Sequence, residues 1–276
     1  MLYNRQKLLL QLIDLIDKHS IHSKLYTMKT IFLLRQKFGF ENVSYDFYPY
    51  KHGPFSNIVY KDINYLISQN LLESDEKTIT TKGNELIEKT EFAIEIENEA
   101  KNILLEFKTT DSIKEFVYSN YPQFTVKSAS PRKTMQKEHG ICSIGYEGKS
   151  IDTFLNQLIQ NNITLLVDVR NNPFSMKREF CADKLNEYLK NCGIEYLHIP
   201  ELGIESEKRK ELNSETDYKE LFEEYESKLY SKELVVDKIR KLGKEQKIAL
   251  MCFEADKNCC HRGTLSEHLA CGVEHL

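Results

Sequence analysis

The sequence predicts an α/β fold, a mostly parallel sheet with flanking helices, for the C-terminal half, and a smaller α+β domain for the N-terminal half. Between residues 140 and 276, short apolar runs alternate with segments of helical periodicity, a pattern typical of strand–helix–strand units. Between residues 4 and 107, helical periodicity dominates and is interrupted by two short strand-like segments. Residues 122–139 lack periodicity. We therefore expect one domain at 1–121, a linker at 122–139 and a second domain at 140–276.

The composition indicates packed domains in a reducing compartment. The chain has 276 residues, of which 41% are hydrophobic and 11% aromatic, so it is long enough for two cores. Its net charge of -4 means that any contact with nucleic acid depends on a local basic surface. The seven cysteines follow no disulfide spacing, and we find neither a signal peptide nor an apolar run of membrane-spanning length. We expect a cytoplasmic protein with free thiols and no membrane partner.

The N-terminal half begins with three helical segments. Apolar residues recur at helical spacing in residues 4–19 and 24–38, and Gly39 is a natural C-terminal cap for the second helix. A third helix is expected from about Ser56 to Gln69. Two short strands are then expected around a tight turn, followed by one helix. The strands are placed at 71–74 and 78–81, and the helix at 83–107.

The phrases "KHGPFS…VYKDINYLISQNLLES" and "ITTKGNELI" resemble winged helix-turn-helix proteins over roughly residues 3–90. That resemblance implies that the third helix is the recognition helix and that Lys77 lies at the wing tip. Phosphate contacts would come from four lysines, which are Lys51, Lys61, Lys77 and Lys82. The third helix carries few basic residues, and Asp62 is on it. The alternative is a winged helix used for protein interaction or for oligomerisation.

A short amphipathic helix is expected at 112–121, and the linker follows it. Its basic residues are Lys127, Arg132, Lys133 and Lys137. Two interpretations stay open for this segment. It is either a solvated connection or a basic tether that lies along phosphates.

The C-terminal half alternates between strands and helices. Strands are expected at 141–145, 163–169, 194–199, 248–252 and 273–276. Helices are expected at 151–160, 182–190, 206–212, 217–230, 232–243 and 262–270. This alternation implies right-handed crossovers and parallel pairing.

Polar residues follow each of the first four strands. Ligands of an open parallel sheet bind beyond the carboxyl ends of its strands, so these residues predict one site at that edge. We expect the stretches Leu165–Ser175 and Leu250–Arg262, each an apolar strand followed by charges and a turn, to meet there. Gly145 and Tyr146 come at the carboxyl end of the strand at 141–145, and His198 and Glu201 come at that of the strand at 194–199.

Four segments in the C-terminal half resemble the domain of unknown function 488 family. They are "CSIGYEGKSIDTFL", "LLVDVRNNPFS", "IEYLHIPELGI" and "ALMCFEADKNCCHR", and the resemblance covers about residues 140–276. The positions that match the family's motifs are Gly145, Asp168, Arg170, Pro173, Ser175, Glu254, Cys260, His261 and Arg262. The chain has Met176 where a basic residue is expected, with Lys177 and Arg178 after it. The resemblance implies a fold and a motif set, and no reaction.

The residue types at this edge suit phosphate chemistry. The expected substrate-binding residues are Tyr146, Arg170, Ser175, Lys177, Arg178 and Arg262, of which the guanidinium groups form forked contacts with phosphate. The expected catalytic residues are Asp168, Glu254, Cys260 and His261. Cys260 and His261 lie at a helix N-terminus, which favours an anion or a thiolate. The two carboxylates would act as acid and base. The alternative for Asp168 and Arg170 is a buried ion pair.

Other chemistries are weighed by spacing. A phosphatase or rhodanese loop needs a basic anchor or a helix start in the sixth place after its cysteine. Counted from Cys252, the residue in that place is Asn258. Glu254 and Asp256, which lie between the two, would repel an anion. A zinc site on Cys252, Cys259, Cys260 and His261 lacks a paired C-x-x-C spacing. A divalent metal on Asp168, Glu254 and Asp256 also stays open, so the cofactor is unknown: none, or a divalent metal. There is no phosphate-binding loop of the Walker type.

The sequence therefore favours a winged helix that binds nucleic acid or a partner, joined to an α/β domain that hydrolyses a phosphate-bearing substrate. That substrate would be a nucleotide or nucleic acid, in DNA maintenance or defence. One alternative is a regulator that senses a nucleotide without catalysis. Another is a rhodanese-like enzyme that handles sulfur through Cys252 or Cys260, since "LLVDVR" is similar to a rhodanese strand.

Overall fold

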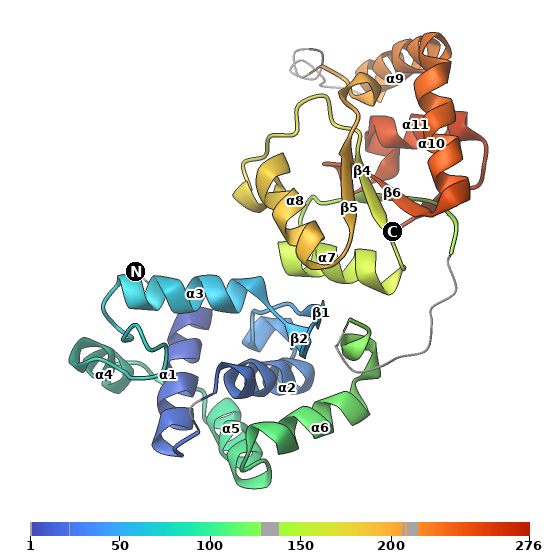
Figure 1. Cartoon of the computed structure of the whole chain (residues 1–276). Coiled ribbons are helices and arrows are strands. Elements are labelled where there is room, and N and C mark those ends of the chain that lie inside the picture. The colour runs from blue at the N-terminus through green and yellow to red at the C-terminus, as the bar shows by residue number, and fades with distance from the viewer. Residues whose placement is uncertain (1, 22, 128–137, 206–207, 209–214) are drawn as a thin grey trace. The chain divides into compact units, whose positions relative to one another are not determined.

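The computed structural model describes residues 2–21, 23–127, 138–205, 208 and 215–276 (Figure 1). The chain divides into two compact units, Met1–Arg132 and Lys133–Leu276, and each has an apolar core of its own. Residues 128–137, most of the expected linker, and most of the helix expected at 206–212 lie outside the described residues. No helix in the described part of the chain is long and apolar enough to span a membrane. All seven cysteines are free thiols.

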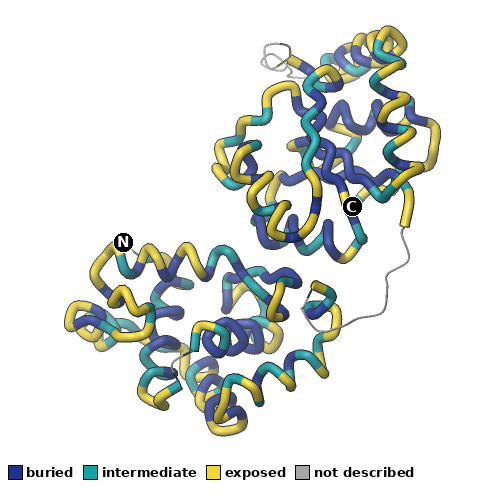
Figure 2. Tube along the Cα trace, in the orientation of Figure 1, coloured by how far each residue is buried: buried dark blue, intermediate teal, exposed yellow. Residues whose placement is uncertain are grey.

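The N-terminal unit is a helical region with one small antiparallel ribbon. Its elements are α1 (Asn4–Lys18), α2 (Lys24–Asn42), β1 (Tyr48–Tyr50), β2 (Gly53–Phe55), α3 (Asn57–Ser68), α4 (Thr81–Glu88), α5 (Ile94–Glu106), α6 (Thr110–Asn120) and the 3₁₀ turn η1 (Pro122–Thr125). Ser23, Ser56 and Thr80 cap the helices that follow them by accepting a backbone N–H. The core is apolar, and Figure 2 shows the inner faces of the helices buried.

Two expected elements of this unit differ from the structure. The single helix expected at 83–107 is two helices, α4 and α5. The chain breaks near Thr90, whose carbonyl accepts a hydrogen bond from Gln11 Nε2 at 3.0 Å and so is tied to α1. The strands expected at 71–74 and 78–81 form only one antiparallel bridge, Leu72 to Ile79, and Asp75 accepts the backbone N–H groups of Lys77 and Thr78 in the turn between them.

The antiparallel ribbon lies earlier, where β1 pairs with β2. Gly53 permits the tight reversal between them with φ of +86°. Gly39, the expected helix cap, also has positive φ, +76°, and α2 is kinked there. The start of the expected linker is the 3₁₀ turn η1, and its Phe124 ring lies 4.9 Å from the Phe32 ring in the N-terminal core.

Lys29 is a buried cation in this unit. Its side chain is fully buried, and Nζ donates hydrogen bonds to the carbonyls of His52 at 2.6 Å and Pro54 at 3.0 Å. Burial, together with repulsion from Lys114, lowers the pKa of Lys29 to about 7.

The free energy of unfolding is therefore expected to rise with pH between about 7 and 10.5. In this window the unfolded chain holds a proton on Lys29 that the folded chain has lost, so raising the pH favours the folded state. The slope is at most about 1.4 kcal/mol per pH unit. Urea denaturation of the wild type at several pH values would measure it, and the same series on Lys29→Met should lack this component. An equal slope in both proteins would contradict the expectation.

The C-terminal unit is built on a five-stranded, all-parallel sheet. The strands are β3 (Gly140–Gly145), β4 (Leu165–Asp168), β5 (Glu195–His198), β6 (Lys247–Cys252) and β7 (Glu274–His275), in the order β5-β4-β6-β3-β7. The expected fold class is confirmed. The strands in the middle of the sheet are buried along nearly their whole length (Figure 2), as expected when helices cover both faces.

Helices cover both faces of this sheet (Figure 1). One face carries α7 (Ile151–Gln160) and α8 (Ala182–Asn191), and the other carries α9 (Glu215–Leu229), α10 (Glu233–Glu245) and α11 (His261–Leu269). Alternate residues of β4 point to opposite faces, so Val167 joins the core beneath α9, α10 and α11. Asp168 points the other way.

Candidate functional site

The site lies where the carboxyl ends of three neighbouring strands meet. Gly145 of β3 is level with Cys252 of β6, and Asp168 of β4 is level with Met251 of β6. The helices that follow β4 and β6 lie on opposite faces of the sheet (Figure 1), and their loops therefore diverge between these two neighbouring strands. Such a point forms the ligand crevice of open parallel sheets. The two stretches expected to meet do so here, since His261 Nε2 lies 3.0 Å from the carbonyl oxygen of Val169.

Two glycines allow the loops at this edge to approach closely. A Cβ atom on Gly145 would lie 1.8 Å from the carbonyl oxygen of Glu254, and one on Gly203 would lie 2.0 Å from the backbone nitrogen of Asn171. No side chain fits at either position. The absence of a Cβ thus brings the loop after β6 against β3, and the loop after β5 against the loop after β4.

Asp168 and Arg170 form a buried ion pair that braces the loop after β4. Arg170 Nε donates to Asp168 Oδ1 at 2.8 Å, and Nη2 donates to Oδ2 at 2.6 Å. The exposed fractions of the Arg170 and Asp168 side chains are 6% and 0%. Tyr196 donates its hydroxyl proton to Asp168 Oδ2 at 2.7 Å, and burial beside this carboxylate raises the pKa of Tyr196 well above its usual range.

Arg170 has further partners that position the next segment. Its Nη1 donates to the Tyr146 hydroxyl at 3.0 Å, and Nη2 donates to the carbonyl of Phe180 at 3.0 Å. Burial opposes the charge of Arg170, but hydrogen bonding and attraction to Asp168 outweigh it, so the pKa is raised. Most of its hydrogen-bonding capacity is used within the protein. The structure therefore gives Asp168 and Arg170 a supporting role at the edge of the cleft.

A cleft of about 560 Å³ opens beside this brace. It is lined by Tyr146, Arg170, Asn171, Asn172, Phe174, Ser175, Met176, Lys177, Ile204, Cys252, Phe253 and His261. Two cationic side chains are among these residues, and none of them carries a carboxylate. The Tyr146 and Phe253 rings meet edge to face, with centroids 5.3 Å apart. An anion attached to a flat or apolar group fits such a lining.

Two thiols and an imidazole meet at the cleft, at the end of β6 and the start of α11. Cys252 Sγ lies 3.7 Å and Cys260 Sγ 4.0 Å from His261 Nδ1. All three side chains are at most 2% exposed. Because the Val169 carbonyl can only accept a hydrogen bond, His261 Nε2 carries the proton and the Nδ1 lone pair points toward the sulfurs. Burial raises the pKa of Cys260 well above its usual range, and Cys252 adds to this effect.

Glu254 and Arg262 shape the loop beside this cluster. Cys252 Sγ donates to Glu254 Oε2 at 3.4 Å, so the carboxylate lies next to the thiols. Arg262 donates to the carbonyls of Glu254 and Ala255, and its buried Nε atom has no hydrogen-bond partner among the described residues. Arg262 does not line the cleft. It holds the loop in place.

The remaining expected phosphate ligands lie on the loop after β4. Ser175 and Lys177 line the cleft, and Lys177 Nζ donates to the carbonyl of Lys149 at 2.8 Å. Arg178 lies outside the lining and forms an exposed ion pair with Asp183. Met176 is 95% exposed. Of the three basic residues expected on this segment, Arg170 and Lys177 face the cleft.

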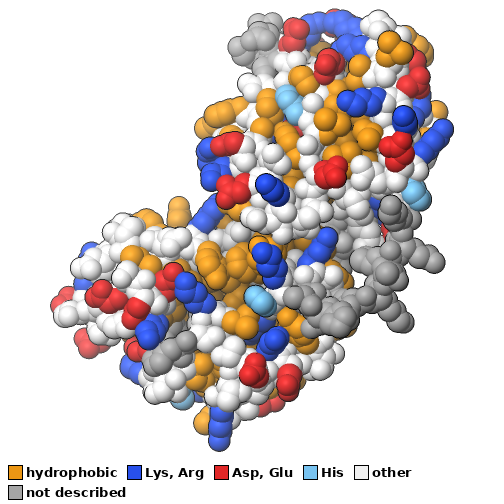
Figure 3. Space-filling model, in the orientation of Figure 1, with side chains coloured by type: hydrophobic (Ala, Val, Ile, Leu, Met, Phe, Trp, Pro, Cys, Tyr) orange, Lys and Arg blue, Asp and Glu red, His pale blue; other side chains and the backbone are white. Residues whose placement is uncertain are grey.

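The four lysines expected to contact nucleic acid lie on separate elements of the N-terminal unit. Lys51 is in the turn between β1 and β2, Lys61 on α3, Lys77 in the turn before α4, and Lys82 on α4. All four are exposed. Asp62 on α3 is buried against Arg5, Gln6 and Tyr45. In the view of Figure 3, basic and acidic side chains are interspersed over this unit.

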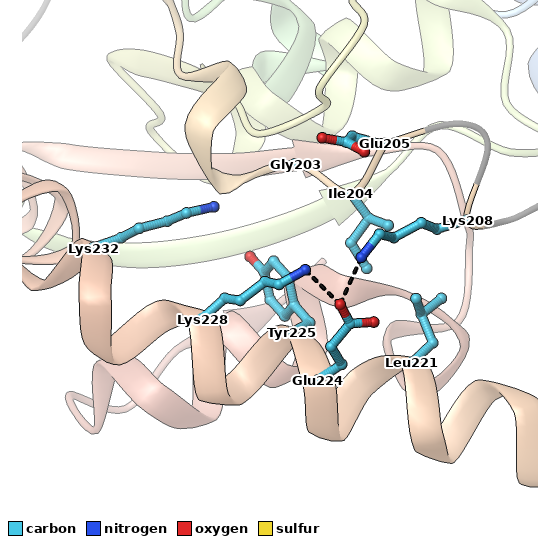
Figure 4. Close-up of a pocket in the computed structure, with 9 residues that line it drawn as sticks. All are labelled: Gly203, Ile204, Glu205, Lys208, Leu221, Glu224, Tyr225, Lys228 and Lys232. Carbon is cyan, nitrogen blue, oxygen red and sulfur yellow. Dashed lines mark hydrogen bonds and ion pairs between the residues drawn. The ribbon is translucent and has the colours of Figure 1, made fainter.

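A second, smaller cavity of about 90 Å³ lies under α9. Figure 4 shows Lys208 and Lys228 pointing to Glu224, with hydrogen bonds of 2.6 Å and 2.5 Å. One carboxylate thus pairs with both lysines, and these three side chains together keep one net positive charge. Tyr225 lines this cavity and also contacts the candidate site. Its hydroxyl donates to the carbonyl of Leu202 at 2.7 Å, and its ring meets the His261 ring edge to face.

Several residues of the site were not expected from the sequence. Tyr225 supports His261 from a helix whose pattern predicts only packing. Phe174 and Phe253 belong to the cleft, and both are exposed to solvent. The signal that the sequence offered for Phe253 was an aromatic residue directly after an apolar strand. The three expected carboxylate metal ligands do not form a group, and Cys259 is exposed. Within the described residues, the group that comes together is Cys252, Cys260 and His261.

Comparison with protein families gives one match. Residues 150–269 match the family model described as Domain of unknown function DUF488. Comparisons with curated proteins and with solved structures gave no significant match.

Proposed function

We propose that the C-terminal unit, which belongs to the family described as Domain of unknown function DUF488, is an enzyme that hydrolyses a phosphate-bearing substrate, a nucleotide or nucleic acid. The observation that carries this proposal is the lining of the cleft. It combines Arg170 and Lys177 with aromatic rings, and it ends at the buried Cys252 and His261.

The charges of the cleft favour an anion. Arg170 and Lys177 are the cationic groups of the lining. The charge of Arg170 is compensated by the buried Asp168, whereas Lys177 Nζ, among the described residues, donates only to a backbone carbonyl, so its charge is available to an anion. The amide groups of Asn171 and Asn172 add neutral donors. The rings of Tyr146 and Phe253 offer a surface for a base. Glu254, whose Oε2 lies 3.4 Å from Cys252 Sγ, supplies a base of the kind used in hydrolysis.

We further propose that the N-terminal unit is a winged helix that places this enzyme on nucleic acid. Three helices followed by a turn with one antiparallel bridge support the proposal of a winged helix. The exposed residues Lys61, Lys77 and Lys82 lie on the third helix, the turn and the next helix. Such contacts with phosphates depend strongly on salt. A role in DNA maintenance or in defence against foreign DNA would suit the pairing of the two units.

Nucleotides are expected to raise the melting temperature of the full chain, because a ligand of the folded state stabilises it by mass action. Thermal unfolding with a panel of nucleotides, short DNA and short RNA would measure the shift. Replacing Lys177 by alanine should weaken binding about three- to tenfold, a modest loss because the ammonium group is exposed.

The control is Lys190→Ala, which removes an exposed lysine from α8, outside the cleft lining. It should bind like the wild type. No shift with any nucleotide or nucleic acid would contradict a phosphate-bearing substrate. Equal loss in both variants would place the anion elsewhere on the surface.

A second candidate, an enzyme that handles sulfur, is favoured by the contact of 3.7 Å between Cys252 Sγ and His261 Nδ1. That pair resembles an activated thiol nucleophile. Iodoacetamide would then modify Cys252 in the metal-free protein faster than exposed Cys259, and peptide mass spectrometry would show which thiol reacted. Modification of Cys259 alone would contradict this candidate.

A further inference from the structure

We propose that Cys252, Cys260 and His261 bind one Zn²⁺ ion, with a fourth coordination position that opens into the cleft. The binding of the ion is inferred from the structure alone. The use of the fourth position for catalysis rests on the proposed function. The three ligand atoms, Cys252 Sγ, Cys260 Sγ and His261 Nδ1, all lie within 4.8 Å of one another.

Their separations are close to those of a tetrahedral site. Zinc–sulfur bonds of about 2.3 Å and zinc–nitrogen bonds of about 2.0 Å place a sulfur and a nitrogen ligand about 3.5 Å apart. The observed distances from His261 Nδ1 are 3.7 Å to Cys252 Sγ and 4.0 Å to Cys260 Sγ. Side-chain adjustments of a few tenths of an ångström would bring both sulfurs to that separation from Nδ1.

The imidazole is already oriented as a metal ligand. Its Nε2–H donates to the carbonyl of Val169 at 3.0 Å, which fixes the ring and directs the Nδ1 lone pair at the thiols. A backbone carbonyl is one of the usual hydrogen-bond partners of the second ring nitrogen of a zinc-bound histidine. The Tyr225 ring packs against the imidazole with centroids 5.4 Å apart, so the orientation is also held by packing.

The donor set selects the metal and its role. Two sulfurs and one imidazole suit zinc better than magnesium or calcium, which prefer oxygen ligands. Three protein ligands leave one position for water, as in catalytic zinc sites. Cys252 and His261 line the cleft, so that water would be accessible to a substrate. Glu254 Oε2, 3.4 Å from Cys252 Sγ, is the nearby carboxylate that could accept its proton.

Zinc content of the purified full chain tests the site. After incubation with excess Zn²⁺ and gel filtration, elemental analysis should find one zinc per chain in the wild type. Cys252→Ser and Cys260→Ser should each lower the bound zinc at least tenfold. The matched control is Cys259→Ser, which removes the exposed thiol next to Cys260 and should keep one zinc per chain.

A second measurement on the wild type covers variants that fail to fold. Cobalt substituted for zinc should give the intense visible bands of a tetrahedral site and a sulfur charge-transfer band in the near ultraviolet. A chelator should abolish both features. Absence of bound zinc and of these bands, or equal loss of zinc in Cys259→Ser, would overturn the metal site.

The two proposals fail separately. Bound zinc in a protein that no nucleotide or nucleic acid stabilises would leave the metal site standing and overturn the phosphate-bearing substrate. Nucleotide binding by a chain that takes up no zinc would overturn the metal site and leave the phosphate-bearing substrate standing.

Discussion

Replacing Asp168 by alanine is expected to destabilise the C-terminal unit by about 3–5 kcal/mol, because it leaves the charge of Arg170 buried without its partner. The carboxylate accepts three hydrogen bonds from Arg170, two from its side chain and one from its backbone N–H, and another from Tyr196. Asp168→Asn should cost less, since an amide oxygen still accepts. Urea unfolding combined with hydrogen exchange of peptides from β4 would measure the loss in this unit.

The matched control is Asp183→Asn, which breaks the exposed pair with Arg178. That pair has the same residue types in solvent, so its loss should change stability little. A double-mutant cycle with Arg170→Met would isolate the coupling. A loss in Asp168→Ala no larger than that in Asp183→Asn would show that the buried pair does not brace the site.

The sequence was sufficient for the fold of the C-terminal half because each of its elements repeats a strong local pattern. Strands such as Lys247–Cys252 are apolar from Ile248 onward, and helices such as Ile151–Gln160 follow a serine cap. The order of strands is set by packing between distant segments, and no local pattern encodes it. The break between α4 and α5 was missed for the same reason, because a hydrogen bond from Gln11, 79 residues away in sequence, holds the chain there.

The location of the site at this edge of the sheet could be predicted from the rule for parallel sheets. The roles of its individual residues could not. Asp168, Arg170 and Arg262 have the residue types of a phosphate site, yet their side chains bond within the protein. Whether a charged group faces substrate or supports a loop depends on partners that come from other strands. Cys252 faces the cleft and Cys259 is exposed, a distinction that spacing alone could not make.

The second large effect is expected for Gly145→Ala. The new methyl group would lie 1.8 Å from the carbonyl oxygen of Glu254, and neither side of this contact is a flexible side chain. The loop after β6 is also tied to the loop after β3 by a hydrogen bond of 2.8 Å from Glu147 N to the carbonyl of Phe253. We expect a destabilisation of roughly 3 kcal/mol, near the upper end of the typical range of about 1–3 kcal/mol for overpacked sites.

The displacement of the loop after β6 should disturb the site as well as lower the stability. Arg262 holds the carbonyl of Glu254 from the other side, so a loop pushed away from Gly145 shifts both Glu254 and Cys252. The variant should therefore bind zinc more weakly even where it is fully folded. Gly148→Ala is the control: φ there is +72° with nothing within 4 Å of the new atom, so it introduces backbone strain of about 1 kcal/mol without a collision. Normal zinc binding in Gly145→Ala at full occupancy of the folded state would show that the close approach of this loop is not needed to align the ligands.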